Sequence, residues 1–353
     1  MRLFAPFLIL ILLVTDLRGQ ITDLVAISEP PGEKVSYLLF SDNGSGYRLI
    51  DAFNARSIDL ARNYPQLSVS GDFTGDGVDE LAMFNDLEYT PNMNPAFTRP
   101  VVTVSRSNGE QFIPSGTWFS TSDTLMDFGF VSFSVAGDYN LDGRDDIAVF
   151  YNDPSLDSLT IYLLGSNGYD FSEAEPWYTV NRNEFNFTAL KFACPGDFNG
   201  NGKPDIAVFY NYFGSAPETS QAVFLFESEG DSFSLLPAVY NSTKAVYDFS
   251  AMKFAIAGDY NLDGYSDIAL FYEDPADQDL VIPVFKGSLN GELTTAEFIS
   301  FPGSDPDLAH VVHVAGGNFA GDSAADLALF YDNPVSGYQE ILNLAHEISD
   351  VPE

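Results

Sequence analysis

Cysteine is nearly absent from this sequence, with Cys194 the single one in 353 residues. An intrachain disulfide is therefore excluded. The stretch LKFACPGD predicts a small buried thiol on a strand, and no neighbouring residue supplies the base that a catalytic cysteine requires. Because extracellular proteins commonly rely on disulfides, a chain of that kind without them needs another source of stability, such as bound metal.

Basic residues are also scarce: 15 Lys and Arg stand against 51 Asp and Glu, which gives a formal net charge of −36. Nucleic acids and anionic membranes are bound by clustered Lys and Arg, so neither is expected as a partner. The acidic surplus suits the binding of cations, or keeps an extracellular protein soluble. A halophilic source would explain the same composition.

Histidine occurs only as His310, His313 and His346. His310 and His313 are three positions apart, which on a strand places them on opposite faces and makes them poor partners for one metal ion. The motifs GxSxG, HExxH and the phosphate-binding P-loop are missing. No catalytic residue is therefore assigned.

Long apolar runs are missing beyond the N-terminus. Residues 3–14 form the one extended run, preceded by Arg2 and followed by a passable cleavage site before Gln20. This order is typical of a secretory signal peptide over residues 1–19, and the run is too short to span a bilayer. We expect a secreted or cell-surface protein with no membrane span. An N-terminal anchor and a buried strand are the alternatives.

The sequence is rich in aromatic residues, at 14%, and it contains a repeat. Five segments share a loop that begins at the Asp or Asn after a glycine, and this Asp or Asn is position 1 of the loop. The segments recur about every sixty residues. The segments are VSGDFTGDGVDELAMF from Val69, VAGDYNLDGRDDIAVF from Val135, CPGDFNGNGKPDIAVF from Cys194, IAGDYNLDGYSDIALF from Ile256 and AGGNFAGDSAADLALF from Ala315.

Each repeat predicts four short antiparallel strands. The first ends at the start of the loop, and the second begins at the last loop carboxylate, as in DIAVFY. The third precedes a turn of the Asn-Gly type, and the fourth carries a Trp or its equivalent. This pattern is typical of a β-propeller blade, and the continuous apolar second strand fits burial between blades. A parallel β-helix, with its shorter repeats, is the structural alternative.

The chain ends bear on the number of blades. Residues 21–27 match a second strand with no loop before it, and YQEILNLA near the C-terminus matches a third strand. The chain then has six second–third hairpins but only five first and five fourth strands. We expect residues 20–353 to form a single all-β propeller domain, preferably of six blades, with five or seven as alternatives.

Oxygen-bearing side chains occupy loop positions 1, 3, 5 and 9, and position 6 is usually glycine. Ca²⁺ takes about six to eight oxygen ligands in a flexible geometry, and glycine allows the sharp turn. The two strongest predicted sites use these side chains and the backbone carbonyl at position 7. They consist of Asp138, Asn140, Asp142, Arg144 and Asp146, and of Asp259, Asn261, Asp263, Tyr265 and Asp267.

The other loops depart from this pattern. A third site, weaker because it has one carboxylate fewer, consists of Asp197, Asn199, Asn201, Lys203 and Asp205. A fourth, with Asp79 as a substitute ligand, consists of Asp72, Thr74, Asp76, Val78 and Glu80. The loop that begins at Asn318 lacks two ligands and is expected to hold no metal. The predicted cofactor is Ca²⁺ at three to four structural sites.

These loops resemble the calcium loops of FG-GAP (VCBS-type) repeats, the units of the integrin alpha-subunit propeller and of many microbial surface proteins. The resemblance spans almost all of residues 21–345 and implies a calcium-binding β-propeller. A single DxNxDG also fits an EF-hand, but here strands flank the loop, and the last acid stands at position 9 rather than 12. Integrin-type propellers usually have more blades than this chain can form.

The connections between second and third strands vary most in length and are the expected ligand face, as the resemblance also implies. The longest run from Asn85 to Arg99 and from Asn211 to Ser220. A tyrosine beside an acid or amide recurs there, which suits a sugar ring; packing between blades is the alternative role. The candidate ligand-binding residues are Tyr151, Tyr210, Tyr212, Tyr272 and Tyr331.

We therefore expect a non-enzymatic, calcium-stabilised adhesion or binding module for an extracellular glycan or protein. A calcium-dependent polysaccharide lyase or hydrolase that uses acidic loop residues is one alternative, and a purely structural envelope protein is another. Sequons at Asn43, Asn186 and Asn241 would carry glycans only in a eukaryotic secretory route.

Overall fold

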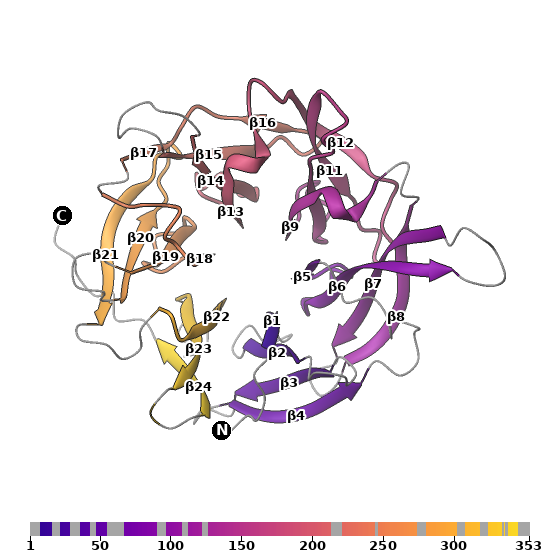
Figure 1. Ribbon diagram of the computed structural model, residues 1–353, viewed down its shortest axis with the longest axis horizontal. Coiled ribbons are helices and arrows are strands. Elements are labelled where there is room, and N and C mark those ends of the chain that lie inside the picture. The colour runs from indigo at the N-terminus through magenta and orange to yellow at the C-terminus, as the bar shows by residue number, and fades with distance from the viewer. Residues whose placement is uncertain are drawn as a thin grey trace. The chain divides into compact units, whose positions relative to one another are not determined.

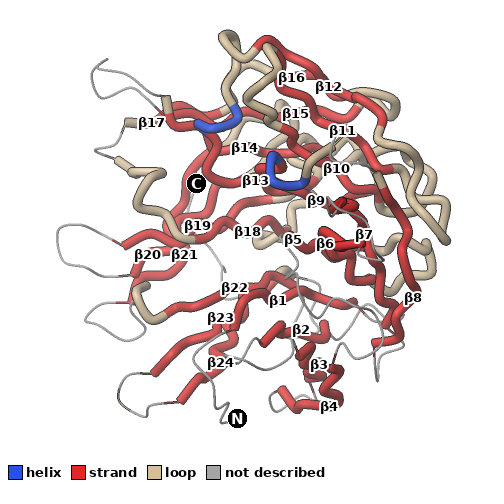
Figure 2. Tube along the Cα trace, turned by 45° about the vertical axis from the view of Figure 1, so that its right-hand side comes forward, coloured by secondary structure: helices blue, strands red, loops and turns tan. Residues whose placement is uncertain are grey.

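A computed structural model of the chain describes residues 8–15, 22–28, 36–42, 47–54, 67–89, 97–107, 112–121, 126–212, 221–243, 246–273, 280–301, 308–317, 324–333, 335 and 338–344. Strands dominate these residues, with two single-turn 3-10 helices among them (Figure 2). In the described part of the chain, neither helix is long or apolar enough to cross a membrane.

The chain forms two compact units, the first of which is Ala5–Phe187. It contains three four-stranded sheets in which neighbouring strands are antiparallel (Figure 1). The strands are β1 (Leu8–Thr15), β2 (Thr22–Ser28), β3 (Ser36–Asp42) and β4 (Tyr47–Asn54); β5 (Leu67–Gly71), β6 (Glu80–Tyr89), β7 (Phe97–Ser107) and β8 (Phe112–Ser120); and β9 (Val131–Gly137), β10 (Asp146–Tyr151), β11 (Ser158–Leu164) and β12 (Glu175–Asn181). The helix η1 (Phe128–Phe130) precedes β9.

The second unit comprises Met1–Phe4 and Thr188–Glu353. The helix η2 (Phe187–Ala189) lies where the chain enters it. Its strands are β13 (Leu190–Gly196), β14 (Asp205–Asn211), β15 (Gln221–Ser228), β16 (Phe233–Leu235) and β17 (Tyr240–Ser242); β18 (Phe254–Gly258), β19 (Asp267–Glu273), β20 (Leu280–Lys286) and β21 (Thr294–Phe301); and β22 (Val311–Gly317), β23 (Asp326–Asn333) and β24 (Tyr338–Leu344). Both β16 and β17 pair with β15, so the fourth strand of that sheet is split in two.

The strand boundaries predicted from the repeat are confirmed. In each repeat the first strand ends at the glycine before the loop, and the second begins at position 9 of the loop. The first strands β5, β9, β13, β18 and β22 all follow this rule, as do the second strands β6, β10, β14, β19 and β23. The predicted third strand YQEILNLA is β24.

The preference for six blades is not confirmed. Five described sheets have at least four strands, and the sheet β22–β24 has three, so the described chain shows five complete blades. The structure departs from the prediction at the N-terminal end. The first sheet is completed by β1, which comes from the predicted signal peptide and pairs with β2. Residues after Leu344 lie outside the described part of the chain.

One predicted connection is wrong. The segment from Asn85 to Tyr89 was expected in a loop, but it belongs to β6, which pairs with β7 as far as Tyr89 and Phe97. Pairing persists because apolar and polar residues alternate along this stretch, which suits an extended hairpin. The connection itself is residues 90–96, outside the described residues.

The core follows the second and third strands of the blades. Every residue of β10 and β14 is buried, as their continuous apolar sequences predict. Phe150 and Phe209 have no exposed surface. Burial of such a side chain stabilises the fold by about 1.5–3 kcal/mol relative to leaving it exposed. These strands therefore supply a large share of the hydrophobic stabilisation.

Within each unit, first strands of successive blades contact each other: β5 with β9, and β18 with both β13 and β22. The glycine before the loop lies where this approach is tightest. A Cβ atom on Gly258 would stand 2.6 Å from the Cβ of Ala325, and one on Gly196 would stand 2.7 Å from the Cβ of Ser266. The recurring glycine therefore fits a packing requirement between blades as well as the turn itself.

Candidate functional site

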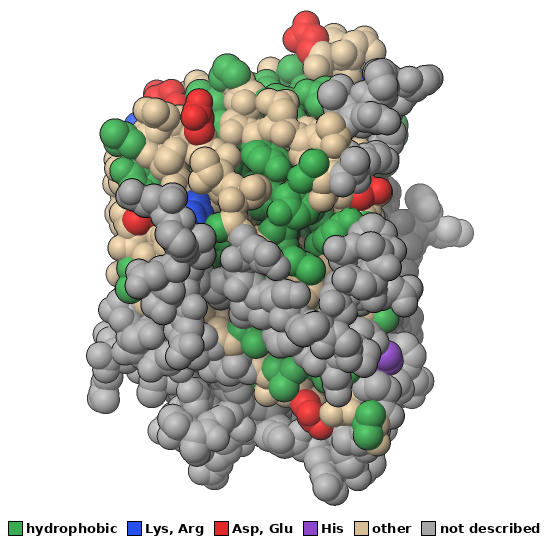
Figure 3. Space-filling view, turned by 90° about the vertical axis from the view of Figure 1, so that its left-hand side faces the viewer, with side chains coloured by type: hydrophobic (Ala, Val, Ile, Leu, Met, Phe, Trp, Pro, Cys, Tyr) green, Lys and Arg blue, Asp and Glu red, His purple; other side chains and the backbone are tan. Residues whose placement is uncertain are grey.

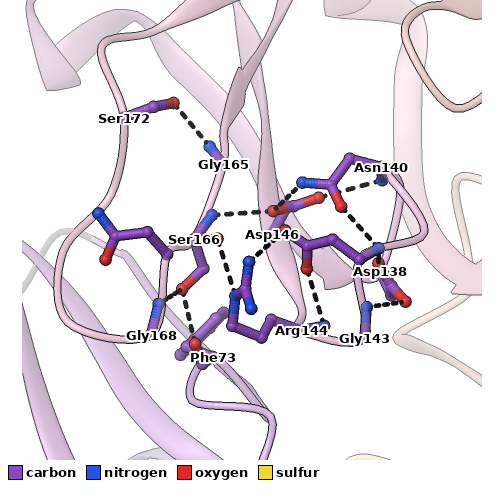
Figure 4. Close-up of polar contacts among 12 residues, drawn as sticks. Phe73, Asp138, Asn140, Gly143, Arg144, Asp146, Gly165, Ser166, Gly168 and Ser172 are labelled. Atoms are coloured by element: carbon purple, nitrogen blue, oxygen red, sulfur yellow. Dashed lines mark hydrogen bonds and ion pairs between the residues drawn. The ribbon is translucent and has the colours of Figure 1, made fainter.

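The loop between β9 and β10 is folded around the carboxylate of Asp138 (Figure 4). Its Oδ1 accepts a hydrogen bond from the Asp142 backbone N–H at 2.9 Å, and its Oδ2 accepts one from Gly143 N–H at 2.9 Å. Asn140 Oδ1 accepts a second bond from Asp142 N–H, also at 2.9 Å. The side chains at positions 1 and 3 thus fix the backbone of positions 5 and 6.

The buried side chain at position 9, Asp146, ties the loop to the turn after β11. Asp146 has no exposed surface, and it accepts backbone hydrogen bonds from Asn140 at 3.2 Å and from Ser166, in the turn after β11, at 2.9 Å. Burial raises the pKa of Asp146 to about 7, against the lowering effect of these bonds, and the nearby Asp142 and Asp138 add to the rise. A buried carboxylate with acidic neighbours is a group that a cation stabilises in its charged form.

The same construction recurs in three further loops. The carboxylate at position 1 accepts from the backbone N–H groups of positions 5 and 6 in the loops that begin at Asp72, Asp197 and Asp259, over 2.8–3.2 Å. The carboxylates at position 9 are buried, and burial raises the pKa of Asp205 and of Asp267 to about 7 and that of Glu80 to about 8.

The first loop accommodates its substitutions. Glu80 at position 9 accepts from the Thr74 backbone N–H at 3.0 Å and from the Thr74 hydroxyl at 3.3 Å. Its longer side chain therefore reaches the backbone group that Asp146 reaches in the second loop. Arg106, which lies at the end of β7, is close enough to oppose the rise in the pKa of Glu80.

The third loop differs at its buried carboxylate. Asp205 Oδ1 accepts from Ser228 N–H at 3.2 Å, but Asp205 Oδ2 is buried without a hydrogen-bond partner. Glu227, at the end of β15, accepts from the side-chain amides of Asn199 at 3.2 Å and Asn201 at 3.3 Å. Glu227 was not predicted from the sequence, because its approach depends on the pairing of β15 with β14.

Calcium fits these loops by the kind of donor present. In the described residues, no group of three or more His, Cys, Asp or Glu side chains has the arrangement of metal ligands. The loops also contain Asn or Thr side-chain oxygens and backbone carbonyls, which are donors that Ca²⁺ accepts. The unpartnered Asp205 Oδ2 is an oxygen that such an ion would satisfy. In the second loop the Asp142 carboxylate pairs with Arg144 at 2.5 Å, and this pair competes with a metal.

Two backbone features hold the loops in shape. Position 6 has positive φ at Gly77, Gly143, Gly202 and Gly264, as the sequence predicts. Position 4 also has positive φ, and there the residues are Gly75, Leu141, Gly200 and Leu262. Sequence reasoning missed position 4 because leucine rarely adopts this conformation.

The aromatic residue at position 2 was also missed. Phe73, Tyr139, Phe198 and Tyr260 occupy this position, and none has exposed surface. The recurrence of Phe or Tyr directly after the Gly-Asp pair was the available signal. These rings anchor each loop to the core beneath it.

Successive loops are joined by a repeated backbone hydrogen bond. The N–H at position 8 donates to the position 1 carbonyl of the preceding loop: Asp145 to Asp72 at 2.9 Å, Ser266 to Asp197 at 2.8 Å, and Ala325 to Asp259 at 3.0 Å. Asp145 Oδ2 also accepts from Asp72 N–H at 3.0 Å. Neighbouring loops within a unit are therefore mechanically connected.

The predicted ligand-binding tyrosines are mostly inaccessible. Tyr151, Tyr210, Tyr272 and Tyr331 are each at most 8% exposed, which agrees with packing between strands. Tyr212 is 46% exposed and packs against Tyr210 at a ring distance of 4.8 Å. The structure thus leaves Tyr212 as the one accessible member of the predicted set. Trp118 and Trp177 are buried as well.

The fifth loop, from Asn318 to Ser323, lies outside the described residues. Its predicted lack of metal stays a prediction. Asp326 at position 9 is described and fully buried, as in the other loops.

The comparisons with known proteins agree with the repeat. Residues 138–208 match the model of the FG-GAP-like repeat, and residues 192–226 match that of the FG-GAP repeat. No curated protein matches the sequence.

Solved structures with a similar course of the chain include a lectin from Agrocybe aegerita that recognises non-reducing terminal N-acetylglucosamine (15% identity, 88% of each chain, TM-score 0.48). They also include an exo-β-1,3-galactanase from Phanerochaete chrysosporium (13% identity, 87% of this chain and 71% of that one, TM-score 0.41) and an exo-inulinase from Aspergillus awamori (10%, 89% and 69%, 0.44). Residues 138–226 of this chain therefore carry FG-GAP-type repeats, and their loops lie between the first and second strands of antiparallel β-propeller blades.

Proposed function

We propose that this chain is a secreted, calcium-stabilised binding module. It binds an extracellular glycan or protein through the connections between the second and third strands of its blades. The observation that carries the calcium part is the fourfold repetition of one loop construction, with a carboxylate at position 1 and a buried carboxylate at position 9. Buried acids without a counter-charge are unfavourable, and calcium in each loop relieves that cost.

The calcium acts on the scaffold in this proposal. The residues that hold it are those at positions 1, 3, 5 and 9, and the ion supplies positive charge and coordination. The loops lie between first and second strands, whereas the proposed ligand face lies at the other end of the second strand. Tyr212, at that end of β14, is exposed and offers a ring on which a sugar can stack.

In the unit Ala5–Phe187, the connection between the second and third strands β10 and β11 is held rigid. Arg182 donates to Asn152 Oδ1, to the carbonyl of Asp153 and, at 3.1 Å, to the carbonyl of Leu156, so one guanidinium fixes the connection between β10 and β11. A rigid connection loses little conformational entropy on binding a ligand. This supports a role in recognition.

The test is binding of the full-length secreted chain to a glycan array and to extracellular proteins, in calcium and in EGTA. We expect calcium-dependent binding that Tyr212→Ala weakens. Tyr169→Ala is the matched control, because Tyr169 is 79% exposed but lies in the turn between β11 and β12. Absence of any binding, or equal loss in both variants, contradicts the ligand face. Release of reducing or unsaturated sugar ends would instead favour an enzyme.

A further inference from the structure

The third loop is the poorest in carboxylates of the three DxNx(D/N)G loops. It has Asn201 at position 5, where the loops that begin at Asp138 and Asp259 have Asp142 and Asp263. An ion in this loop would meet two loop carboxylates, Asp197 and Asp205, rather than three. Calcium affinity depends on ligand charge, so a loop of this composition alone should bind weakly.

Glu227 approaches the loop at the point of this deficit. Its Oε1 lies 3.2 Å from Asn199 Nδ2 and 3.3 Å from Asn201 Nδ2, the side chains at positions 3 and 5. In an Asn side chain, the Oδ1 atom that can bind an ion and the Nδ2 atom that can donate to a carboxylate are close together. An ion bound to Oδ1 of Asn199 and Asn201 would therefore be reached by the Glu227 carboxylate through a side-chain rotation.

An independent observation points to a cation in the same place. Asp205 Oδ2 is fully buried and has no hydrogen-bond partner. The corresponding oxygens are satisfied elsewhere, since Asp146 Oδ2 accepts from Asn140 N–H and Asp267 Oδ2 accepts from Tyr260 N–H, both at 3.2 Å. An unpartnered buried carboxylate oxygen is costly, and a bound cation removes that cost.

Among the four blades with described loops, only this blade has an acid at this register position. Glu227 follows Phe226, the partner of Ile206 in β14. In the blades of the other three described loops, the residues at the same register position are Arg106, Gly165 and Lys286. An acid thus stands at this position in the blade whose loop lacks one.

We propose that Glu227 is an additional calcium ligand of the third loop and replaces the carboxylate missing at Asn201. The inference rests on the proposed calcium binding. It assigns the ligand to a strand of the blade rather than to the loop itself. Glu227 accordingly makes this site comparable in charge to those of the loops that begin at Asp138 and Asp259.

The test is calorimetric calcium titration and thermal unfolding of the metal-stripped full chain. Glu227→Gln keeps an oxygen that can accept from the two Asn amides but removes the charge. We expect one site of the variant to bind calcium at least about tenfold more weakly, with the Tm in EGTA unchanged. Adding Asn201→Asp to Glu227→Gln should restore the affinity. Glu229→Gln, at an exposed position in the following turn, is the matched control and should change nothing.

The outcomes separate the two proposals. If the wild type binds calcium and Glu227→Gln binds it equally well at every site, Glu227 is not a ligand and only this inference fails. If Glu227→Gln lowers the Tm in EGTA as much as in calcium, Glu227 merely holds the Asn side chains, and the inference fails too. A wild type that takes up no calcium overturns the proposed function together with it.

Discussion

At the scale of single residues, two loops place a leucine in a left-handed backbone conformation that leucine disfavours. Leu141 and Leu262 have φ of 61° and 60°, where two other loops have glycine. Both leucines are about half exposed, at 48% and 53%, so they contribute little burial in exchange. A non-glycine residue in this left-handed region costs about 1–2 kcal/mol.

Replacing Leu141 by glycine should therefore stabilise the protein. Glycine removes the strain but loses about 0.5–1 kcal/mol through the greater freedom of the unfolded chain, which leaves a net gain of up to about 1.5 kcal/mol. Chemical denaturation measures this change. Leu156→Gly is the control: Leu156 is similarly exposed, at 44%, but its φ is not positive, so its substitution should destabilise. Equal destabilisation by both substitutions would contradict the strain.

Cys194 should be unreactive in the folded protein. Its side chain is buried, and burial raises the pKa of the thiol to about 12. Because the thiolate is the reacting species, we expect no modification by DTNB under native conditions and one thiol per chain after unfolding in guanidinium chloride. Rapid stoichiometric reaction of the native protein would show that β13 is open to solvent.

At the scale of strands and loops, the glycine before each loop allows blades to pack closely. Gly258→Ala should destabilise by about 1–3 kcal/mol, because the new Cβ would stand 2.6 Å from Ala325 Cβ. The double variant Gly258→Ala with Ala325→Gly should recover most of that loss. A double-mutant cycle in urea measures the coupling. Additive effects would mean that this contact does not limit the packing.

Much at this scale was predictable from the sequence. The boundary residues Gly137 and Asp146 and their counterparts are marked in every repeat, because turn chemistry and burial both act at those positions. The split of the fourth strand into β16 and β17 was not marked, since short strands differ little from turns in composition. The approach of Glu227 to Asn199 was not visible either, because it depends on strand register across 28 residues.

The ligand face was the least predictable part. The sequence places a tyrosine at the end of most second strands, but it does not distinguish a ring that packs from one that is exposed. The structure buries Tyr151 and Tyr272 and exposes Tyr212, which follows the last residue of β14.

At the scale of the whole molecule, the large negative net charge affects the stability of the fold. The chain carries a net charge of −36, and on the face drawn in Figure 3 the described acidic side chains are scattered with few basic ones between them. Self-repulsion of this kind destabilises a folded protein and is screened by salt. We expect the Tm in EGTA to rise as NaCl is raised from about 0.01 to 0.15 M, over which the Debye length falls from about 30 to 8 Å. Calcium should reduce this dependence of Tm on salt. A Tm in EGTA that does not change with salt would contradict the self-repulsion.

The central claim is that the repeated loops hold calcium as a stabilising ion. The most direct measurement is thermal unfolding of the metal-stripped full chain with and without calcium, together with the number of ions bound. We predict three to four ions per chain and a marked rise in Tm, since free calcium at about 100 times Kd adds about 2.7 kcal/mol per site. No bound calcium and superimposable unfolding curves would contradict the account.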